Sequence, residues 1–222
     1  MRHISDLHIG AKPEYANKLK LIVAQLVATS HLDSSPVAIT GDVTENGYAH
    51  EYALAKRLLR PLRDAGIPIL AVPGNHDCGP QGIVWSAQAR ARYERWHDEV
   101  CMPSEGSTWP RVWHHAGRRI IGLDSQAGQE GEWLPPLARG ELGQRQLMLL
   151  EVELQTPAPT TILLHHHPLW HDPAHLLEDA VQLRKLLERR AWVDDVLFGH
   201  QHRAGVWEFG GVRYVAQGAS TR

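Results

Sequence analysis

The sequence predicts an α/β fold, in which short buried strands alternate with amphipathic helices along the chain. Three apolar runs have the length of buried strands, at residues 37–40, 67–72 and 161–164. Between such runs, apolar residues recur at helical spacing, as at Leu19, Ile22 and Leu26. Polar residues able to bind ligands follow several of the predicted strands, which is where ligands gather in α/β sheets.

The N-terminal half of the chain is predicted to contain strands and helices in strict alternation. The strands are expected at residues 2–5, 37–40 and 67–72. The helices are expected around residues 19–26, 55–62 and 85–100, where apolar residues share one face. Pro61 lacks a backbone N–H and is expected to kink or restart the second helix, and Gly66 is expected to stop it.

The C-terminal half continues the alternation and is predicted to close with a hairpin. Strands are expected at residues 119–123, 161–164 and 196–198, with helices at 147–154 and 176–190. The hairpin is expected to pair residues 206–209 with 212–215 around Gly210-Gly211, because two consecutive glycines suit a tight turn. No repeat or linker divides the sequence, so we expect one domain that spans residues 1–222.

The composition is that of an ordinary soluble globular protein, with 43% apolar and 22% charged residues. The formal net charge is −2, so no basic face is required and we expect no binding of duplex nucleic acid. We find no signal peptide and no apolar run near the ~20 residues that span a bilayer, so we expect a cytoplasmic protein with no membrane partner. The two cysteines, Cys78 and Cys101, are too few for a disulfide framework.

The fifteen histidines prompt a search for clusters, because histidine is the commonest metal ligand. Seven polar residues lie where strands are predicted to end: Asp6, His8, Asp42, Asn75, His165, His200 and His202. Two carboxylates, one amide oxygen and four imidazoles suit two divalent transition metals, such as Mn, Fe or Zn. If each metal takes four protein ligands, seven residues must supply eight contacts, so one carboxylate is expected to bridge.

A pair of metals at this site would determine the chemistry. Two metals ~3.5–4 Å apart stabilise the attacking and leaving oxygens of an in-line displacement at phosphorus. A hydroxide that bridges them would be the nucleophile, so no nucleophilic side chain is required. Each residue alone has an ordinary interpretation, with Asp6 as a helix cap or Asp42 as a strand-exit residue. The presence of all seven together favours the metal site.

Five short motifs occur in an order that is typical of one protein family, each after a predicted strand. They are Asp-x-His at residues 6–8, Gly-Asp at 41–42, Gly-Asn-His-Asp at 74–77, His-His-His-Pro at 165–168 and Gly-His-x-His at 199–202. In these motifs the chain resembles the calcineurin-like metallophosphoesterase superfamily. Leu123-Asp124-Ser125 and Gly140-Glu141-Leu142 make it most similar to the class III branch, the bacterial cyclic-nucleotide phosphodiesterases. The resemblance implies a four-layer α/β/β/α sandwich of two mixed sheets flanked by helices.

The resemblance also implies a role for each residue of the site. One metal would be bound by Asp6, His8, Asp42 and His202, and the other by Asp42, Asn75, His165 and His200. His76 matches the histidine that contacts phosphate and serves as general acid, and Glu45 matches a carboxylate that pairs with it. Asn75 and His76 are expected to contact the substrate, as is His171, which lies a few residues after a metal-bearing loop.

The leading interpretation of the sequence is therefore a dinuclear metal-dependent phosphohydrolase. We expect a phosphodiesterase that acts on cyclic nucleotides or other small phosphodiesters through a metal-bridging hydroxide. The same site would suit a phosphomonoesterase, or a nuclease acting on single strands or ends. The alternative outside enzymes is a scaffold that kept the fold but lost the chemistry, and such a protein should lack ligands or His76, which this sequence retains. Unassigned tryptophans leave room for a homodimer.

Overall fold

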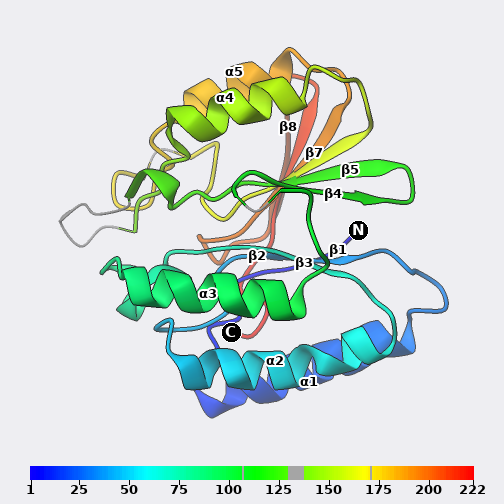
Figure 1. Cartoon of the computed structure of the whole chain (residues 1–222), viewed down its shortest axis with the longest axis vertical. Helices are drawn as coiled ribbons and strands as arrows, with labels where there is room; N and C mark the ends of the chain where they lie inside the picture. The colour runs from blue at the N-terminus through cyan, green and yellow to red at the C-terminus, as the bar shows by residue number, and fades with distance from the viewer. Residues whose placement is uncertain (107, 130–137, 171) are drawn as a thin grey trace.

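The computed structural model describes residues 1–106, 108–129, 138–170 and 172–222, and it confirms the four-layer arrangement. Two β-sheets lie face to face in the middle of the molecule, and helices cover the outer face of each sheet (Figure 1). Within the described residues, no helix has both the length and the apolar character that crossing a membrane would require.

The first sheet has three parallel strands in the order β1-β2-β3. These strands are β1 (Arg2–Ile4), β2 (Val37–Thr40) and β3 (Ile69–Val72). The helices on this side are α1 (Pro13–Ala28), α2 (Ala49–Asp64) and α3 (Ala87–Val100). Their apolar faces share one core with the strands, in which Leu19, Leu59 and Trp96 are buried, as the helical spacing predicts.

The second sheet has six strands in the order β4-β5-β6-β7-β9-β8 and is mixed. Its strands are β4 (Arg111–His115), β5 (Arg118–Gly122), β6 (Thr160–Leu163), β7 (Val193–Phe198), β8 (Gly205–Phe209) and β9 (Val212–Ala216). The helices α4 (Gly143–Glu153) and α5 (Ala180–Glu188) cover its outer face (Figure 1). Leu150 of α4 and Leu183 of α5 are fully buried in one core with Ile162 and Phe198 of the strands.

A separate apolar cluster joins the inner faces of the two sheets. It contains Leu70 and Val72 from the first sheet and Trp113 and Leu163 from the second. Trp113 is the largest fully buried side chain of the described chain. A Cβ at Gly122, on the neighbouring strand, would lie 2.8 Å from the Trp113 ring, so a glycine is needed there for the indole to fit between the sheets.

The structure differs from the sequence predictions in three respects. Strand β4 is not among the predicted strands, because charged and polar residues interrupt its apolar pattern, and antiparallel pairing with β5 specifies it instead. Helix α2 continues through Pro61 to Asp64 without restarting. Pro61 lies in the last turn, and its missing N–H removes one helical hydrogen bond, to the carbonyl of the exposed residue Arg57. The first sheet is not mixed but wholly parallel, because helical crossovers join its strands.

The carboxyl ends of strands from both sheets come together at one edge of the molecule. The segments that leave β1 and β2 stay paired, with the Asp6 N–H donating to the Gly41 carbonyl at 3.1 Å. The segments that leave β6 and β7 are joined in the same way, by Gly199 N–H and the His165 carbonyl at 3.1 Å. A Cβ at Gly41 would lie 2.3 Å from His165 Nδ1, so the segment that follows β2 in the first sheet contacts the segment that follows β6 in the second.

The fully buried carboxylate of Asp77 connects the segment that follows β2 to the segment that follows β3. This carboxylate accepts the backbone N–H groups of Val43, Thr44 and Gly74, each at 3.1 Å. The hydroxyls of Thr44 and Tyr52 also donate to it, at 3.1 and 3.2 Å. Burial raises the pKa of Asp77 to about 6, while the hydrogen bonds from the backbone oppose that rise. The group is therefore ionised at neutral pH and fixes the spacing of the two loops.

We predict that replacing Asp77 with alanine strongly destabilises the protein, because three buried N–H groups would lose their acceptor. Urea denaturation should show a fall in the free energy of unfolding of about 3 kcal/mol or more. Asp33→Ala is the control, because Asp33 also accepts a backbone N–H, from Ser35, but is exposed. No measurable change is expected there, and equal transitions for the two variants would contradict the role of Asp77.

Candidate metal centre

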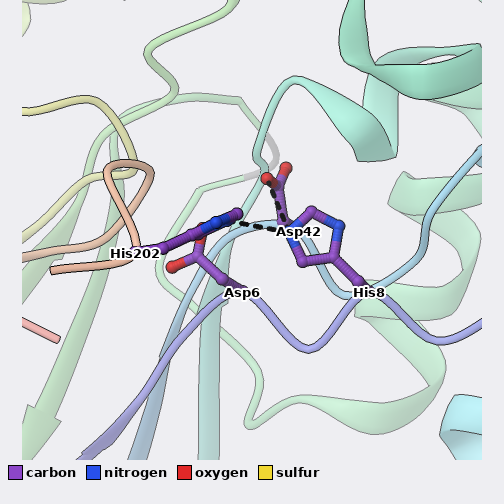
Figure 2. Close-up of side chains that lie close together, drawn as sticks. All are labelled: Asp6, His8, Asp42 and His202. Atoms are coloured by element: carbon purple, nitrogen blue, oxygen red, sulfur yellow. Dashed lines mark hydrogen bonds and ion pairs between the residues drawn. The ribbon is translucent and has the colours of Figure 1, made fainter. Parts of the chain in front are cut away.

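The structure brings all seven predicted ligands into one compact site, in two groups that share Asp42. In each group, one donor atom from every member lies within 4.8 Å of the others. The first group is Asp6, His8, Asp42 and His202, whose side chains point toward one another in Figure 2. The second group is Asp42, His165 and His200, and the amide oxygen of Asn75 lies 3.1 Å from His165 Nε2. Six of the seven side chains are buried, and His202 is 27% exposed.

Asp42 lies between the two groups and uses its two oxygens differently. Its Oδ2 lies 3.7 Å from His8 Nε2 in the first group and 3.4 Å from His165 Nε2 in the second. Its Oδ1 accepts the backbone N–H of His76 at 3.0 Å. Gly74 leaves room for this contact, because a Cβ there would lie 2.2 Å from Oδ1. One oxygen is thus fixed by the backbone while the other faces both groups, as a bridging ligand would.

Ring nitrogens face one another in both groups, which is an arrangement that a cation would satisfy. His8 Nε2 lies 3.1 Å from His202 Nε2, and His165 Nε2 lies 3.2 Å from His200 Nδ1. Neutral rings can place at most one hydrogen between each pair, so lone pairs and carboxylate oxygens converge on two small volumes. Mixed nitrogen and oxygen donors suit divalent transition metals, so the donor chemistry of both groups fits such cations.

Five of the seven residues have a positive φ, a conformation that residues other than glycine rarely adopt. They are Asp6 (54°), His8 (42°), Asp42 (51°), His200 (73°) and His202 (52°). Elsewhere in the described chain, only Gln81 and Ala116 share it among non-glycine residues. Each such residue costs on the order of 1–3 kcal/mol, and such residues cluster at functional sites. Backbone strain is therefore concentrated at the candidate ligands.

The amide of Asn75 is oriented by the loop that follows it. Its Nδ2 donates to the carbonyl of Gly82 at 3.1 Å, which turns Oδ1 toward the second group. Gly82 has a φ of +68°, and a Cβ there would lie 2.2 Å from Asn75 Nδ2. A side chain at residue 82 would therefore both strain the backbone and push the amide out of position.

Two of the histidines are held by acceptors outside the groups. His8 Nδ1 lies 2.8 Å from the Glu45 carboxylate, and His165 Nδ1 lies 2.7 Å from the Thr40 carbonyl. Because each acceptor takes the hydrogen on Nδ1, Nε2 is the nitrogen directed into the site. Partners of this kind orient metal-ligating histidines in many proteins. The structure therefore presets two of the four rings for a cation.

Charge within the site shifts the pKa values of its members. Burial tends to raise the pKa of Asp42, but the imidazoles of His165, His76 and His8 hold it well below its usual range. Burial tends to lower the pKa of His165, but attraction to Asp42 raises it to about 9. Burial also holds the pKa of His200 well below its usual range, so that ring is neutral at pH 7. Without a cation, the site therefore keeps a proton on His165 at neutral pH.

Glu45 lies beside His76 as predicted, but its hydrogen bond goes elsewhere. The carboxylate is 3.7 Å from His76 Nδ1, at ion-pair range, whereas its closest partner is His8 Nδ1 at 2.8 Å. The backbone carbonyl of Glu45 accepts from His76 Nδ1 instead, at 2.8 Å. The family resemblance implies the pairing of Glu45 with His76 but does not reveal that one residue supports two histidines.

Among the remaining histidines, His166 and His175 lie beside the site. His166 packs its ring 4.3 Å from that of His200, and its Nδ1 lies 2.7 Å from the Ser125 hydroxyl. The ring of His175 lies 5.5 Å from that of His200. No motif distinguishes His175 in the sequence, so only the folded loop reveals it. The predicted substrate contact His171 falls outside the described residues.

His202 has an arginine neighbour outside the two donor groups. Its Nδ1 lies 2.7 Å from a guanidinium nitrogen of Arg222. A histidine that binds a cation through Nε2 keeps its hydrogen on Nδ1, and two donors cannot share a hydrogen bond. The contact with Arg222 must therefore open when a cation binds His202.

Comparison with known proteins identifies a family for the chain. The family model described as calcineurin-like phosphoesterase matches residues 2–204. A 3',5'-cyclic adenosine monophosphate phosphodiesterase, CpdA, from Vibrio vulnificus is 29% identical over 215 residues, covering 90% of this chain and 68% of that protein. A probable glycerophosphodiester phosphodiesterase, GpdQ, from Arcobacter nitrofigilis is 29% identical over 213 residues, covering 90% of this chain and 70% of that protein.

The fold is also found among solved structures. A dimetal phosphatase from Danio rerio matches with a TM-score of 0.66 and covers 99% of this chain and 87% of its own. The sequence identity is only 18%, so this likeness concerns the fold alone. It agrees with the stacked sheets described above.

We predict that Asp42→Ala lowers the metal content, because the variant removes the donor that both groups share. Elemental analysis of protein purified without chelator should find about two divalent cations per wild-type chain and fewer than one in the variant. His114→Ala is the control, since His114 lies on β4 and is exposed. Unchanged metal content in Asp42→Ala would contradict the bridging role.

We also predict that cation binding at pH 7 releases protons. The His165 ring, with its pKa raised to about 9, carries a proton that must leave before Nε2 can bind a cation. Apparent affinity should therefore rise as pH increases from 7 toward 9 and then level off. Titration calorimetry in buffers with different ionisation enthalpies measures the released protons. A binding enthalpy that is independent of the buffer would contradict this protonation state.

Proposed function

The chain is a hydrolase of the calcineurin-like phosphoesterase family, and we propose that it is a dinuclear metal-dependent phosphodiesterase acting on small phosphodiesters, cyclic nucleotides among them. One observation carries the proposal, namely that two groups of nitrogen and oxygen donors share Asp42. A shared carboxylate brings two cations close enough to act on a single phosphoryl group. The diester preference is supported by the names of the relatives from Vibrio vulnificus and Arcobacter nitrofigilis.

The donor sets indicate which residues would hold the cations. One cation would take Asp6, His8, Asp42 and His202, and the other would take Asp42, Asn75, His165 and His200. Mn, Fe and Zn all suit this mixture of donors. When bound, the cations supply positive charge that stabilises the charge developing on the phosphoryl oxygens. The chain contributes preorganisation, because Glu45 and the Thr40 carbonyl already orient two of the rings.

His76 is the residue that we assign to proton transfer. Its Nδ1 donates to the Glu45 carbonyl, which leaves Nε2 for the substrate. The ring lies 4.6 Å from that of His8, at the edge of the first group. Gly82 keeps this edge open, since a Cβ there would lie 2.9 Å from His76 Nε2. The Glu45 carboxylate lies 3.7 Å from Nδ1, and the protonated ring can give its Nε2 proton to the departing oxygen.

The proposal is tested by hydrolysis assays on chelator-stripped protein, with and without added Mn²⁺. The substrates are bis-p-nitrophenyl phosphate, p-nitrophenyl phosphate, and 2′,3′- and 3′,5′-cyclic nucleotides. We expect Mn²⁺ to restore turnover of diesters, with the monoester a poor substrate. His76→Gln should lower kcat by about 10²–10⁴-fold while leaving metal content unchanged, because it removes the proton donor but no ligand.

Three results would bear against the proposal in different ways. Faster turnover of the monoester would overturn the diester preference and keep the metal site. Full activity in stripped protein without added cation would overturn the metal dependence. Full activity in His76→Gln would overturn the proton-transfer role, with His114→Gln as the matched control because that ring is exposed and lies near Glu105 at 3.5 Å.

A further inference from the structure

A second polar pair, Asp172 and His175, lies beside the candidate metal centre. His175 Nδ1 is 2.8 Å from Asp172 Oδ2, and both side chains are about half-exposed, at 43% and 44%. The His175 ring lies 5.5 Å from the ring of His200, a member of the second donor group. One side of the His175 ring thus adjoins the metal centre, and the residue remains open to solvent.

The turn that carries the pair is fixed by its own hydrogen bonds. Asp172 Oδ1 accepts the Ala174 N–H at 3.0 Å, and the Asp172 carbonyl accepts the His175 N–H at 3.0 Å. Arg139 Nε donates to the Pro173 carbonyl at 2.7 Å and so attaches the turn to the segment that leads into α4. These contacts fix the backbone that carries His175, so the imidazole can move only by rotation of its own side chain.

A comparison within the chain shows why this pair differs from an ordinary surface ion pair. His114 and Glu105 are also a histidine and a carboxylate near each other, at 3.5 Å, with side chains 56% and 73% exposed. No described residue of the metal centre contacts either of them through a ring. Of these two histidine–carboxylate pairs, only Asp172–His175 combines a short hydrogen bond with a ring contact to a donor group.

The hydrogen bond to Asp172 determines what His175 can offer a ligand. Because the carboxylate accepts the hydrogen on Nδ1, Nε2 is the ring nitrogen left to form a hydrogen bond with a ligand. A hydroxyl group suits this nitrogen, because a hydroxyl can both donate and accept a hydrogen bond. His175 is a half-exposed polar side chain next to His200, so it lies within reach of a group esterified to a phosphoryl group at the second donor group.

We propose that His175, oriented by Asp172, accepts a hydrogen bond from a hydroxyl of the group esterified to phosphorus, and so selects hydroxyl-bearing diesters. The substrate class would be ribonucleoside cyclic phosphates or glycerol phosphodiesters rather than their deoxy counterparts. This inference rests on the proposed phosphodiesterase function. It adds a specificity-determining contact outside the predicted ligand set.

The test compares hydrolysis of 3′,5′-cyclic AMP with that of its 2′-deoxy analogue, in Mn²⁺-loaded protein. The wild type should prefer the hydroxyl-bearing substrate in kcat/KM. His175→Phe keeps a planar ring without the acceptor, and should lower kcat/KM for cyclic AMP about three- to tenfold, mainly through KM. The deoxy analogue and bis-p-nitrophenyl phosphate should change less than about twofold. Asp172→Asn should lower the preference by a smaller factor, because the ring loses its fixed orientation.

The controls separate this inference from the function on which it rests. His114→Phe should leave all three rates unchanged. A wild type that hydrolyses bis-p-nitrophenyl phosphate but shows no preference for cyclic AMP over its deoxy analogue contradicts the inference and leaves the phosphodiesterase function standing. An unchanged preference in His175→Phe does the same. Absence of hydrolysis of every diester contradicts the proposed function itself.

Discussion

The geometry of the candidate metal centre depends on one buried carboxylate that belongs to neither donor group. Asp77 accepts three backbone N–H groups and two hydroxyls, and so holds the segment after β2 against the segment after β3. Asp42 and Asn75 lie on these two segments, on either side of the Asp77 contacts. The hydrogen bonds to this carboxylate oppose the cost of burying its charge, and removing it would leave three buried N–H groups without an acceptor. The spacing of Asp42 and Asn75 is therefore set by the hydrogen bonds between Asp77 and the backbone of these two segments.

The donors themselves are held in unfavourable backbone conformations. A positive φ at five candidate ligands would cost several kcal/mol together if each costs on the order of 1–3 kcal/mol. Close packing around the site holds the donors in these conformations. The glycines at residues 41, 74 and 199 allow the segments that follow neighbouring strands to approach where a Cβ would clash. Asp6 also accepts the His200 N–H at 3.1 Å, so a carboxylate from one sheet stabilises a strained residue from the other. Bound cations would offset the remaining strain.

The sequence predicts much of this structure, and the exceptions have physical reasons. Strand ends can be located from apolar runs, and residues that follow parallel strands must converge, so the seven candidate ligands are predictable before the fold is known. Strand β4 is not, because its pairing with β5 rather than its own pattern specifies it. The double role of Glu45 is also hidden, since a side chain and a backbone carbonyl of one residue serve different histidines. His175 reaches the site through a turn pinned by Arg139, a contact that no local spacing predicts.

The two sheets contribute different halves of the site, which couples the chemistry to the packing of the fold. Asp6, His8, Asp42 and Asn75 leave the first sheet, and His165, His200 and His202 leave the second. Neither set offers a complete group of donors by itself, so the site exists only where the sheets are stacked around Trp113 and its neighbours. Direct contacts at the exits keep the halves in register, because a Cβ at Gly199 would lie 2.4 Å from Asp6 Oδ2. The positions of the residues at the strand ends are thereby fixed by contacts with both sheets. The turn that carries His175 is instead held mainly by its own hydrogen bonds and by Arg139. If His175 has its proposed role, substitutions in that turn would alter substrate preference without disturbing the donors.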